Sequence, residues 1–219
     1  MTSPNQLRSA DRVAMVEDQL AGRDITDVFV LEAMKRVPRH AFVPTQLAAR
    51  AYADQPLPIG LGQTISQPYI VALMTQLAAP KGAARVLDVG TGSGYQAAVL
   101  AELADHVFGV EIICEHAEAA SKRLARLGYD NATIRCGDGY HGWSEHAPFD
   151  AIIVAAAPEK VPPALIEQLK PSGRLVIPVG GQRQELRLYL KNADGSVSVR
   201  HVAPVRFVPF VRHPPVQTE

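Results

Sequence analysis

The sequence has few cysteines, no net charge and no long apolar run, and each of these absences excludes a class of protein. Only two cysteines, Cys114 and Cys136, occur in 219 residues. Disulfide frameworks and metal knuckles use closely spaced pairs or higher counts, so we expect two free thiols. The only near pair among the seven histidines, His141 and His146, lies five positions apart and not at the i, i+4 spacing of two zinc ligands on a helix. No metal site is expected.

Charge and hydropathy limit the partners. Lysine and arginine total 22, as do aspartate and glutamate, so no net field favours nucleic acid or a membrane surface. The densest apolar run, residues 151–157, is far shorter than the roughly 20 residues that span a bilayer. Residues 1–12 contain no apolar stretch like that of a signal peptide. We therefore expect a cytoplasmic protein without nucleic-acid or membrane partners.

The N-terminal part has a helical pattern and then a loop. Hydrophobic residues make up 47% of the chain, enough to bury one full core, so a single domain over residues 1–219 is expected. Apolar residues at helical spacing predict helices near residues 13–20, 28–34 and 70–77. The stretch from Pro44 to Pro68 is rich in proline, glycine and glutamine, which predicts a loop with a function of its own.

From residue 85, short apolar runs alternate with helix-length segments, as in βαβ units with a parallel sheet. Strands are predicted at residues 85–89, 106–110, 132–136, 150–154 and 174–178. Residues 185–191 and 196–201 flank an Asp194-Gly195 step, which predicts an antiparallel hairpin. The expected fold is α/β: a Rossmann-like, doubly wound, mostly parallel sheet with an antiparallel C-terminal edge and an N-terminal helical extension. Its parts are residues 1–80, the α/β core at 81–180, and the hairpin and tail at 181–219.

A glycine-rich turn follows the first predicted strand, in Val86-Leu87-Asp88-Val89-Gly90-Thr91-Gly92-Ser93-Gly94-Tyr95. Glycines let the backbone turn sharply and approach a ligand, and the helix that follows presents free N–H groups. The spacing is G-x-G-x-G and not the G-x-G-x-x-G of dinucleotide folds. Asp88 would repel a phosphate but can orient a neutral or cationic cofactor.

Acidic residues follow the next two strands. Glu111 ends the second strand, where a carboxylate can accept both hydroxyls of a ribose. Asp138 follows the third strand, in Cys136-Gly137-Asp138-Gly139, and can accept from an adenine amino group. Because the carboxyl ends of parallel strands meet at one edge, these carboxylates and the glycine turn are expected to face one crevice.

In order and spacing, these motifs resemble those of class I S-adenosylmethionine methyltransferases, as do residues 148–154 and 169–176. Three other segments are similar to the protein-L-isoaspartate O-methyltransferases: Gly62-Gln63-Thr64-Ile65-Ser66-Gln67-Pro68-Tyr69, Val37-Pro38-Arg39-His40-Ala41-Phe42-Val43-Pro44 and Val205-Arg206-Phe207-Val208-Pro209. The resemblance covers roughly residues 12–210.

The resemblance implies S-adenosyl-L-methionine as the methyl donor, S-adenosyl-L-homocysteine as the product, and isoaspartyl-containing proteins and peptides as substrates. The implied acceptor is a free α-carboxylate, a group that ionises in peptides at a pKa of about 3.3–3.7 and needs no general base at neutral pH. Residues 1–80 are predicted to contain the N-terminal helices and the substrate loop. Ser66, in that loop, is implied to be the catalytic residue. The implied cofactor residues, mostly in the core, are Thr64, Ile65, Asp88, Gly90, Gly92, Gly94, Glu111, Asp138 and Gly139.

Several alternatives stay open. Glu111 is followed by Ile112-Ile113-Cys114, where relatives often carry a basic residue, and the tail after Pro209 differs from the usual family endings, which predicts altered peptide contacts. Ser66 can also be the N-cap of the next helix. A class I methyltransferase for a small molecule or RNA, a nicotinamide dehydrogenase, and a non-catalytic binding protein are the competing functions. The oligomeric state is open, and a monomer is compatible with the sequence.

Overall fold

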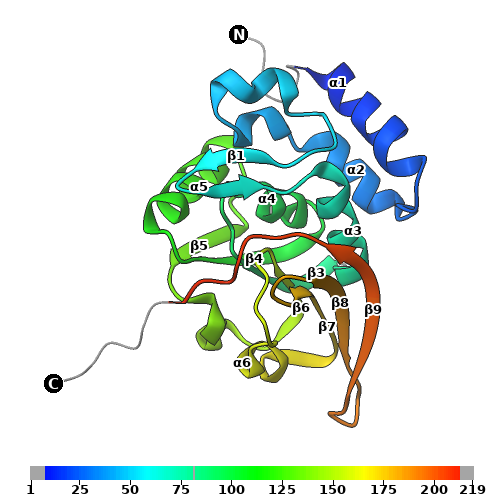
Figure 1. Cartoon of the computed structure of the whole chain (residues 1–219), viewed down its shortest axis with the longest axis vertical. Helices are drawn as coiled ribbons and strands as arrows, with labels where there is room; N and C mark the ends of the chain where they lie inside the picture. The colour runs from blue at the N-terminus through cyan, green and yellow to red at the C-terminus, as the bar shows by residue number, and fades with distance from the viewer. Residues whose placement is uncertain (1–7, 81, 213–219) are drawn as a thin grey trace, which may run out of the picture.

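The computed structural model describes residues 8–80 and 82–212 and is built on a seven-stranded sheet (Figure 1). The strand order is β5-β4-β3-β6-β7-β8-β9, and the first five of these strands are parallel to one another. Strands β8 and β9 add an antiparallel edge. The α/β fold class and its antiparallel C-terminal edge are thus confirmed.

All five predicted parallel strands form. They are β3 (Gly82–Val89), β4 (Ala104–Glu111), β5 (Ala132–Cys136), β6 (Phe149–Val154) and β7 (Leu169–Val179). Strands β8 (Gln184–Lys191) and β9 (Val197–Val205) flank the predicted turn, in which the Gly195 N–H donates to the Asn192 carbonyl at 3.0 Å. The central strands are mostly apolar, as expected for strands of a parallel sheet that is covered on both faces.

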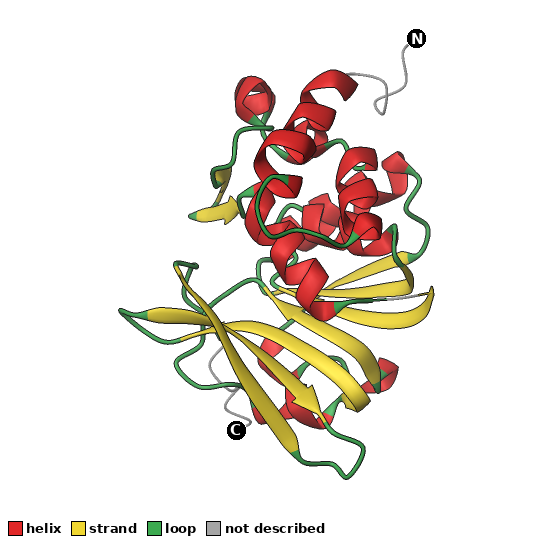
Figure 2. Cartoon of the chain, turned by 90° about the vertical axis from the view of Figure 1, so that its right-hand side faces the viewer, coloured by secondary structure: helices red, strands yellow, loops and turns green. Residues whose placement is uncertain are grey.

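The two faces of the sheet carry separate apolar clusters, since successive side chains of a strand point to opposite sides. Val86 faces the larger cluster, under α3 (Pro68–Ala78) and α4 (Tyr95–Ala101). Leu87 faces the smaller cluster, which contains Leu165 of α6 (Pro163–Glu167). Figure 2 shows most of the helices gathered on one side of the sheet. Helix α5 (Cys114–Leu127) lies between β4 and β5 in the chain and packs on β5.

The N-terminal extension is helical, as predicted. It comprises α1 (Ser9–Ala14), which continues as the π-helical segment η1 (Met15–Ala21), then α2 (Val28–Arg36) and the 3₁₀ turns η2 (Arg39–Phe42) and η3 (Thr45–Arg50). Arg39 of η2 is fully buried, and burial lowers its pKa to about 10. Its guanidinium lies 4.8 Å from the Tyr95 ring centre and donates to the Ala51 carbonyl at 2.8 Å, so it joins the extension to α4.

The stretch between Pro44 and Pro68 was predicted to be a loop, and this prediction is wrong in part. After η3 it forms an antiparallel hairpin of β1 (Leu57–Gly60) and β2 (Gln63–Ile65). The proline and glycine content that favours a loop also suits this short, isolated hairpin, in which Leu61 at the turn has a positive φ of 50°. The hairpin delivers Ser66 to the start of α3.

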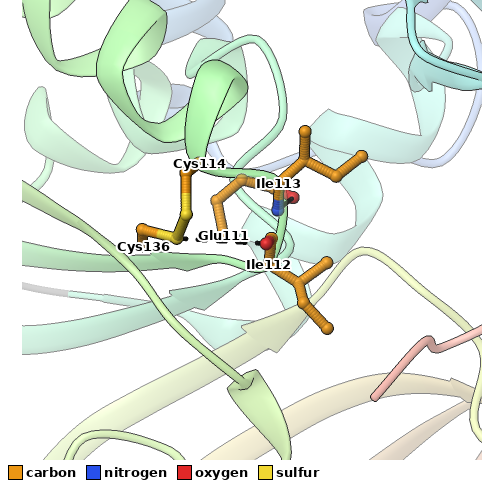
Figure 3. Close-up of a disulfide and its surroundings, with 5 residues drawn as sticks. All are labelled: Glu111, Ile112, Ile113, Cys114 and Cys136. Carbon is orange, nitrogen blue, oxygen red and sulfur yellow. Dashed lines mark hydrogen bonds between the residues drawn. A yellow bond between two sulfur atoms is a disulfide. The ribbon is translucent and has the colours of Figure 1, made fainter. Parts of the chain in front are cut away.

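The prediction of two free thiols is wrong: Cys114 and Cys136 form a disulfide (Figure 3). Their Cα atoms are 4.9 Å apart, a distance typical of disulfides. They are 22 positions apart in the chain, but α5 begins beside the end of β5, because β4 and β5 are neighbouring parallel strands. Spacing in the sequence does not reveal this contact.

No helix in the described ranges is long and apolar enough to cross a membrane. The described residues also contain no group of three or more His, Cys, Asp or Glu side chains placed to hold a metal ion.

Candidate active site

A cavity lies at the carboxyl ends of β3, β4 and β6, where the chain leaves β3 for strands on either side. This switch point is where open α/β sheets bind ligands. Seven of the ten predicted site residues line it: Thr64, Ile65, Ser66, Gly90, Gly92, Glu111 and Gly139. Asp88, Gly94 and Asp138 do not, although each is next to or near a residue that does.

The glycines of the turn between β3 and α4 have two structural roles. Gly92 has a φ of 52°, and an added Cβ would lie 3.3 Å from the Ile59 side chain, so the turn and the β1–β2 hairpin approach closely. Gly94 has a φ of 87° and precedes α4; a Cβ there would lie 3.3 Å from the Ala120 side chain on α5. Gly94 therefore serves helix packing, and its predicted contact with the cofactor stays a prediction.

Glu111 is buried and its carboxylate is held in place from both sides. Oε2 accepts from the Gly92 N–H at 2.7 Å and Oε1 accepts from the Ile113 N–H at 2.9 Å. Each carboxylate oxygen can accept a second hydrogen bond. Glu111 therefore faces the cavity in a fixed position, with lone pairs left for a pair of hydroxyls.

Asp88 lies beneath the glycine turn and is completely buried. Neither of its carboxylate oxygens has a hydrogen-bond partner among the described residues. Burial raises the pKa of Asp88 to about 7. A buried acceptor without a donor is costly, so this carboxylate suits a ligand with a cationic or hydrogen-bonding group nearby.

Asp138 is not among the residues that line the cavity. Its Oδ1 accepts from the Tyr140 N–H at 2.9 Å, and its Oδ2 lies 3.6 Å from Nε of Arg212. Gly139, next in the chain, does line the cavity, and a Cβ there would collide with the Val89 side chain. Gly139 therefore packs directly against Val89 and leaves no room for a side chain there. The predicted adenine contact of Asp138 stays a prediction.

Ser66 is not the cap of α3, so the alternative interpretation of this residue is wrong. The N-cap is Gln67, whose side chain makes no capping bond. Instead, Asp54 reaches in from the preceding loop and accepts from the Tyr69 N–H at 2.9 Å. Arg23 pairs with the other oxygen of Asp54 at 3.0 Å. The Ser66 side chain is thus left to the cavity that it lines.

Other parts of the wall were not predicted. Ala155 and Ala156 follow β6, and their position could have been inferred from the rule that adjacent strand ends share a crevice. Residues 208–211 cross over the cavity, held by hydrogen bonds of 2.9 and 3.0 Å between Ala157 and the backbone of Val208 and Phe210. No sequence pattern points to this contact. The rest of the divergent tail, from residue 213, lies outside the described residues.

Comparison with known proteins gives one family. The family model for protein-L-isoaspartate(D-aspartate) O-methyltransferase matches residues 10–214. A protein-L-isoaspartate O-methyltransferase of Opitutus terrae is 57% identical over 210 residues, which cover 95% of this chain and 90% of that protein. A protein-L-isoaspartate O-methyltransferase 2 of a Polaromonas species is 58% identical over 191 residues, 86% of this chain and 90% of the relative.

Solved structures agree. The crystal structure of a Plasmodium falciparum protein assigned as a protein-L-isoaspartate O-methyltransferase, in complex with S-adenosyl-L-homocysteine, aligns with a TM-score of 0.82 at 26% identity. The alignment covers 92% of this chain and 99% of that one. Sequence and fold together show that the chain belongs to the protein-L-isoaspartate(D-aspartate) O-methyltransferase family.

Proposed function

We propose that this chain methylates the free α-carboxylate of L-isoaspartyl residues in damaged proteins and peptides, with S-adenosyl-L-methionine as the donor. One observation carries the proposal: Ser66 lines the same cavity as the glycine turn and Glu111, and the capping role that would occupy it belongs to Asp54. Family membership and the S-adenosyl-L-homocysteine in the Plasmodium falciparum structure support the proposal.

Different residues of the site fit different parts of the cofactor. Glu111 would hold the ribose hydroxyls, and the backbone at Gly90 and Gly92 leaves room for a close approach. The part of the cavity wall formed by Gly139, next to Asp138 in the chain, would hold the adenine. Asp88 does not line the cavity, but its buried carboxylate under the glycine turn would attract the ammonium group of the methionine part through its charge or through water. The bound cofactor supplies a methyl group on a sulfonium, ready for an in-line displacement.

The chain's own residues orient the acceptor. The Ser66 hydroxyl can donate to one oxygen of the carboxylate while the other oxygen faces the methyl group. Thr64 lies on the same rim and offers a second hydroxyl. Because the carboxylate is ionised at neutral pH, no proton has to be removed. The apolar side chains of Val208 and Phe210 limit the water in the cavity, which favours a reaction between opposite charges.

The test is a methyl-transfer assay with labelled S-adenosylmethionine and two peptides that differ only in an aspartyl or isoaspartyl linkage. We expect label on the isoaspartyl peptide and almost none on its twin. Equal labelling of both peptides, or of neither at saturating cofactor, contradicts the proposal and returns the small-molecule and RNA acceptors to consideration.

Location, domain count and oligomeric state stay predictions. The expected cytoplasmic location has to accommodate the disulfide, because stable disulfides are rare in reducing compartments.

A further inference from the structure

The disulfide joins the first residue of α5 to the last residue of β5, and Figure 3 shows it beside Glu111, the proposed ribose residue. Cys114 begins α5 immediately after the turn that follows Glu111. Cys136 ends β5, lies directly opposite Glu111 in the β4–β5 pairing, and is two positions before Asp138. The Gly137 N–H also donates to the Glu111 carbonyl at 2.9 Å. The disulfide therefore lies at the carboxyl ends of β4 and β5, next to the proposed cofactor residues.

Both cysteines are exposed residues. The proposed methyl transfer uses neither of them. Exposed disulfides are the labile and regulatory class, whereas structural disulfides are usually protected from reductants. A dithiol in solution can therefore reach this bond while the fold stays intact.

We propose that Cys114 and Cys136 form a redox-sensitive site that sets the affinity of the adjoining cavity for its cofactor. The oxidised pair holds the turns of Glu111 and Asp138 in place, and reduction loosens both. The inference rests on the proposed cofactor site and adds a control to it. The co-reactant is a dithiol reductant.

The exchange balances in two steps. A thiolate of the reductant attacks Sγ of Cys136, the S–S bond breaks, and Cys114 leaves as a thiolate. The first turn of the 14-residue helix α5 stabilises this leaving group, since helix N-termini lower thiol pKa values. The second thiol of the reductant then displaces Cys136 and closes a disulfide within the reductant. Two electrons and two protons pass to the protein, which ends with two thiols.

The contacts around the bond give the direction of the effect. Ile113, whose N–H holds Oε1 of Glu111, is the neighbour of Cys114. The Ile112 carbonyl lies 3.9 Å from Sγ of Cys136 and can accept the S–H of the reduced form. Reduction therefore frees the turn that carries one of the two donors to Glu111, while the Gly92 donor remains. We expect weaker cofactor binding, not its loss.

Isothermal titration of S-adenosyl-L-homocysteine tests the proposal on air-oxidised protein, on protein reduced with dithiothreitol, and on the variant C114S/C136S under both conditions. We expect the oxidised protein to bind about fivefold tighter than the reduced protein, the low end of typical coupling between sites. The variant should bind like the reduced protein and ignore the reductant. A thiol assay should find none in the oxidised protein and two in the reduced one, because the chain has no other cysteine.

Three results overturn the proposal. Equal affinity of the oxidised and reduced protein removes the coupling alone and leaves the cofactor site standing. Two free thiols that persist after treatment with oxidised glutathione remove the redox site. Absence of binding in both states contradicts the proposed cofactor site and, with it, the proposed redox control of cofactor affinity. Circular dichroism of the variant checks its fold, and the reduced wild-type protein gives the same comparison without any substitution.

Discussion

Glu111 is the residue on which the cofactor assignment rests most directly. Replacing Glu111 with Ala removes the ribose acceptor and also frees the N–H groups of Gly92 and Ile113. We expect cofactor affinity to fall by roughly 1–3 kcal/mol, the scale of lost charge-assisted hydrogen bonds. Titration calorimetry with S-adenosyl-L-homocysteine measures it, and an unchanged affinity would refute the ribose role.

Asp88 gives the cavity a pH dependence. Its pKa is raised by burial from 3.8 to about 7, so below pH 7 the free protein holds this carboxyl mostly neutral. If the cofactor's ammonium group binds near the carboxylate, binding favours the ionised form and expels a proton. We expect the affinity for S-adenosyl-L-homocysteine to rise as pH increases from 6 to 7 and to level off above 7. A flat profile in wild-type protein would contradict this, and Asp88→Asn should flatten it.

The same residue affects stability, with a sign opposite to that of a paired carboxylate. Between pH 3.8 and 7 the unfolded chain ionises Asp88 while the folded chain keeps the proton, so stability falls through this range and the full loss is present above pH 7. Asp88→Asn should therefore raise the free energy of unfolding above pH 7 and change it little below pH 4. Denaturant titrations at the two pH values provide the comparison.

Ser66 can be separated from its structural surroundings. Because Ser66 does not cap α3, Ser66→Ala should leave the melting temperature and cofactor affinity nearly unchanged. We expect turnover on an isoaspartyl peptide to drop roughly 10- to 100-fold, the equivalent of one hydrogen bond to a charged group. Ser144→Ala, at an exposed site on another turn, is the matched control. Full activity in Ser66→Ala would leave this serine without a role in the transfer.

At the scale of elements, α3 is started by a residue from another segment. Asp54 accepts from the Tyr69 N–H and pairs with Arg23, whose guanidinium also stacks on the Tyr69 ring at 3.4 Å. Asp54→Ala should cost about 0.5–2 kcal/mol of stability, as for other lost caps. It should also slow methylation, because Ser66 is held by the same helix start. Asp54→Asn keeps an acceptor and should restore most of both; failure of Asn to do so would place the effect in the ion pair with Arg23.

The helices and strands that could be predicted are those specified by a pattern within their own residues. The β5 strand was placed at its observed bounds, and the others within a few residues, because apolar runs between turn residues specify buried strands. The β1–β2 hairpin was missed because its strands are only four and three residues long and β1 carries a proline and a glycine, which argue against a strand. Asp54 as a cap was missed for a different reason: it lies 15 positions from the N–H that it serves.

At the scale of the whole molecule, the disulfide closes a loop of 22 residues around α5 and β5. Constraint of the unfolded chain by such a loop is worth about 3 kcal/mol if the effect is entropic. Reduced protein and C114S/C136S should therefore both melt roughly 6–12 °C below the oxidised protein. Calorimetric melts in the three states test this. Equal melting temperatures would mean that the unfolded chain gains little freedom from reduction.

Long-range contacts set the limit of what the sequence reveals about the site. Motifs at strand ends correctly placed Gly90, Glu111 and Gly139 on the cavity wall, since the sheet brings successive strand ends together. The disulfide and the tail over the cavity depend on segments that meet only in the folded chain. Asp138 and Gly94 also have structural roles that the motif did not predict: Asp138 accepts from the Tyr140 N–H, and Gly94 packs against Ala120 of α5. Their cofactor contacts stay predictions.

The tight turn between β8 and β9 exposes the enzyme to the lesion that it repairs. Isoaspartyl residues arise when the backbone nitrogen after an aspartate attacks the side-chain carbonyl carbon, and a following glycine offers no steric protection. Asp194-Gly195 is such a step. Here the Gly195 N–H is engaged with the Asn192 carbonyl, and Asp194 Oδ1 is held by Ser196 at 2.6 and 2.9 Å. The two bonds from Ser196 lower the pKa of Asp194 and so favour the ionised carboxylate, which is a poorer electrophile than the neutral acid. The lesion is therefore expected to form at this step more slowly than in an unstructured chain.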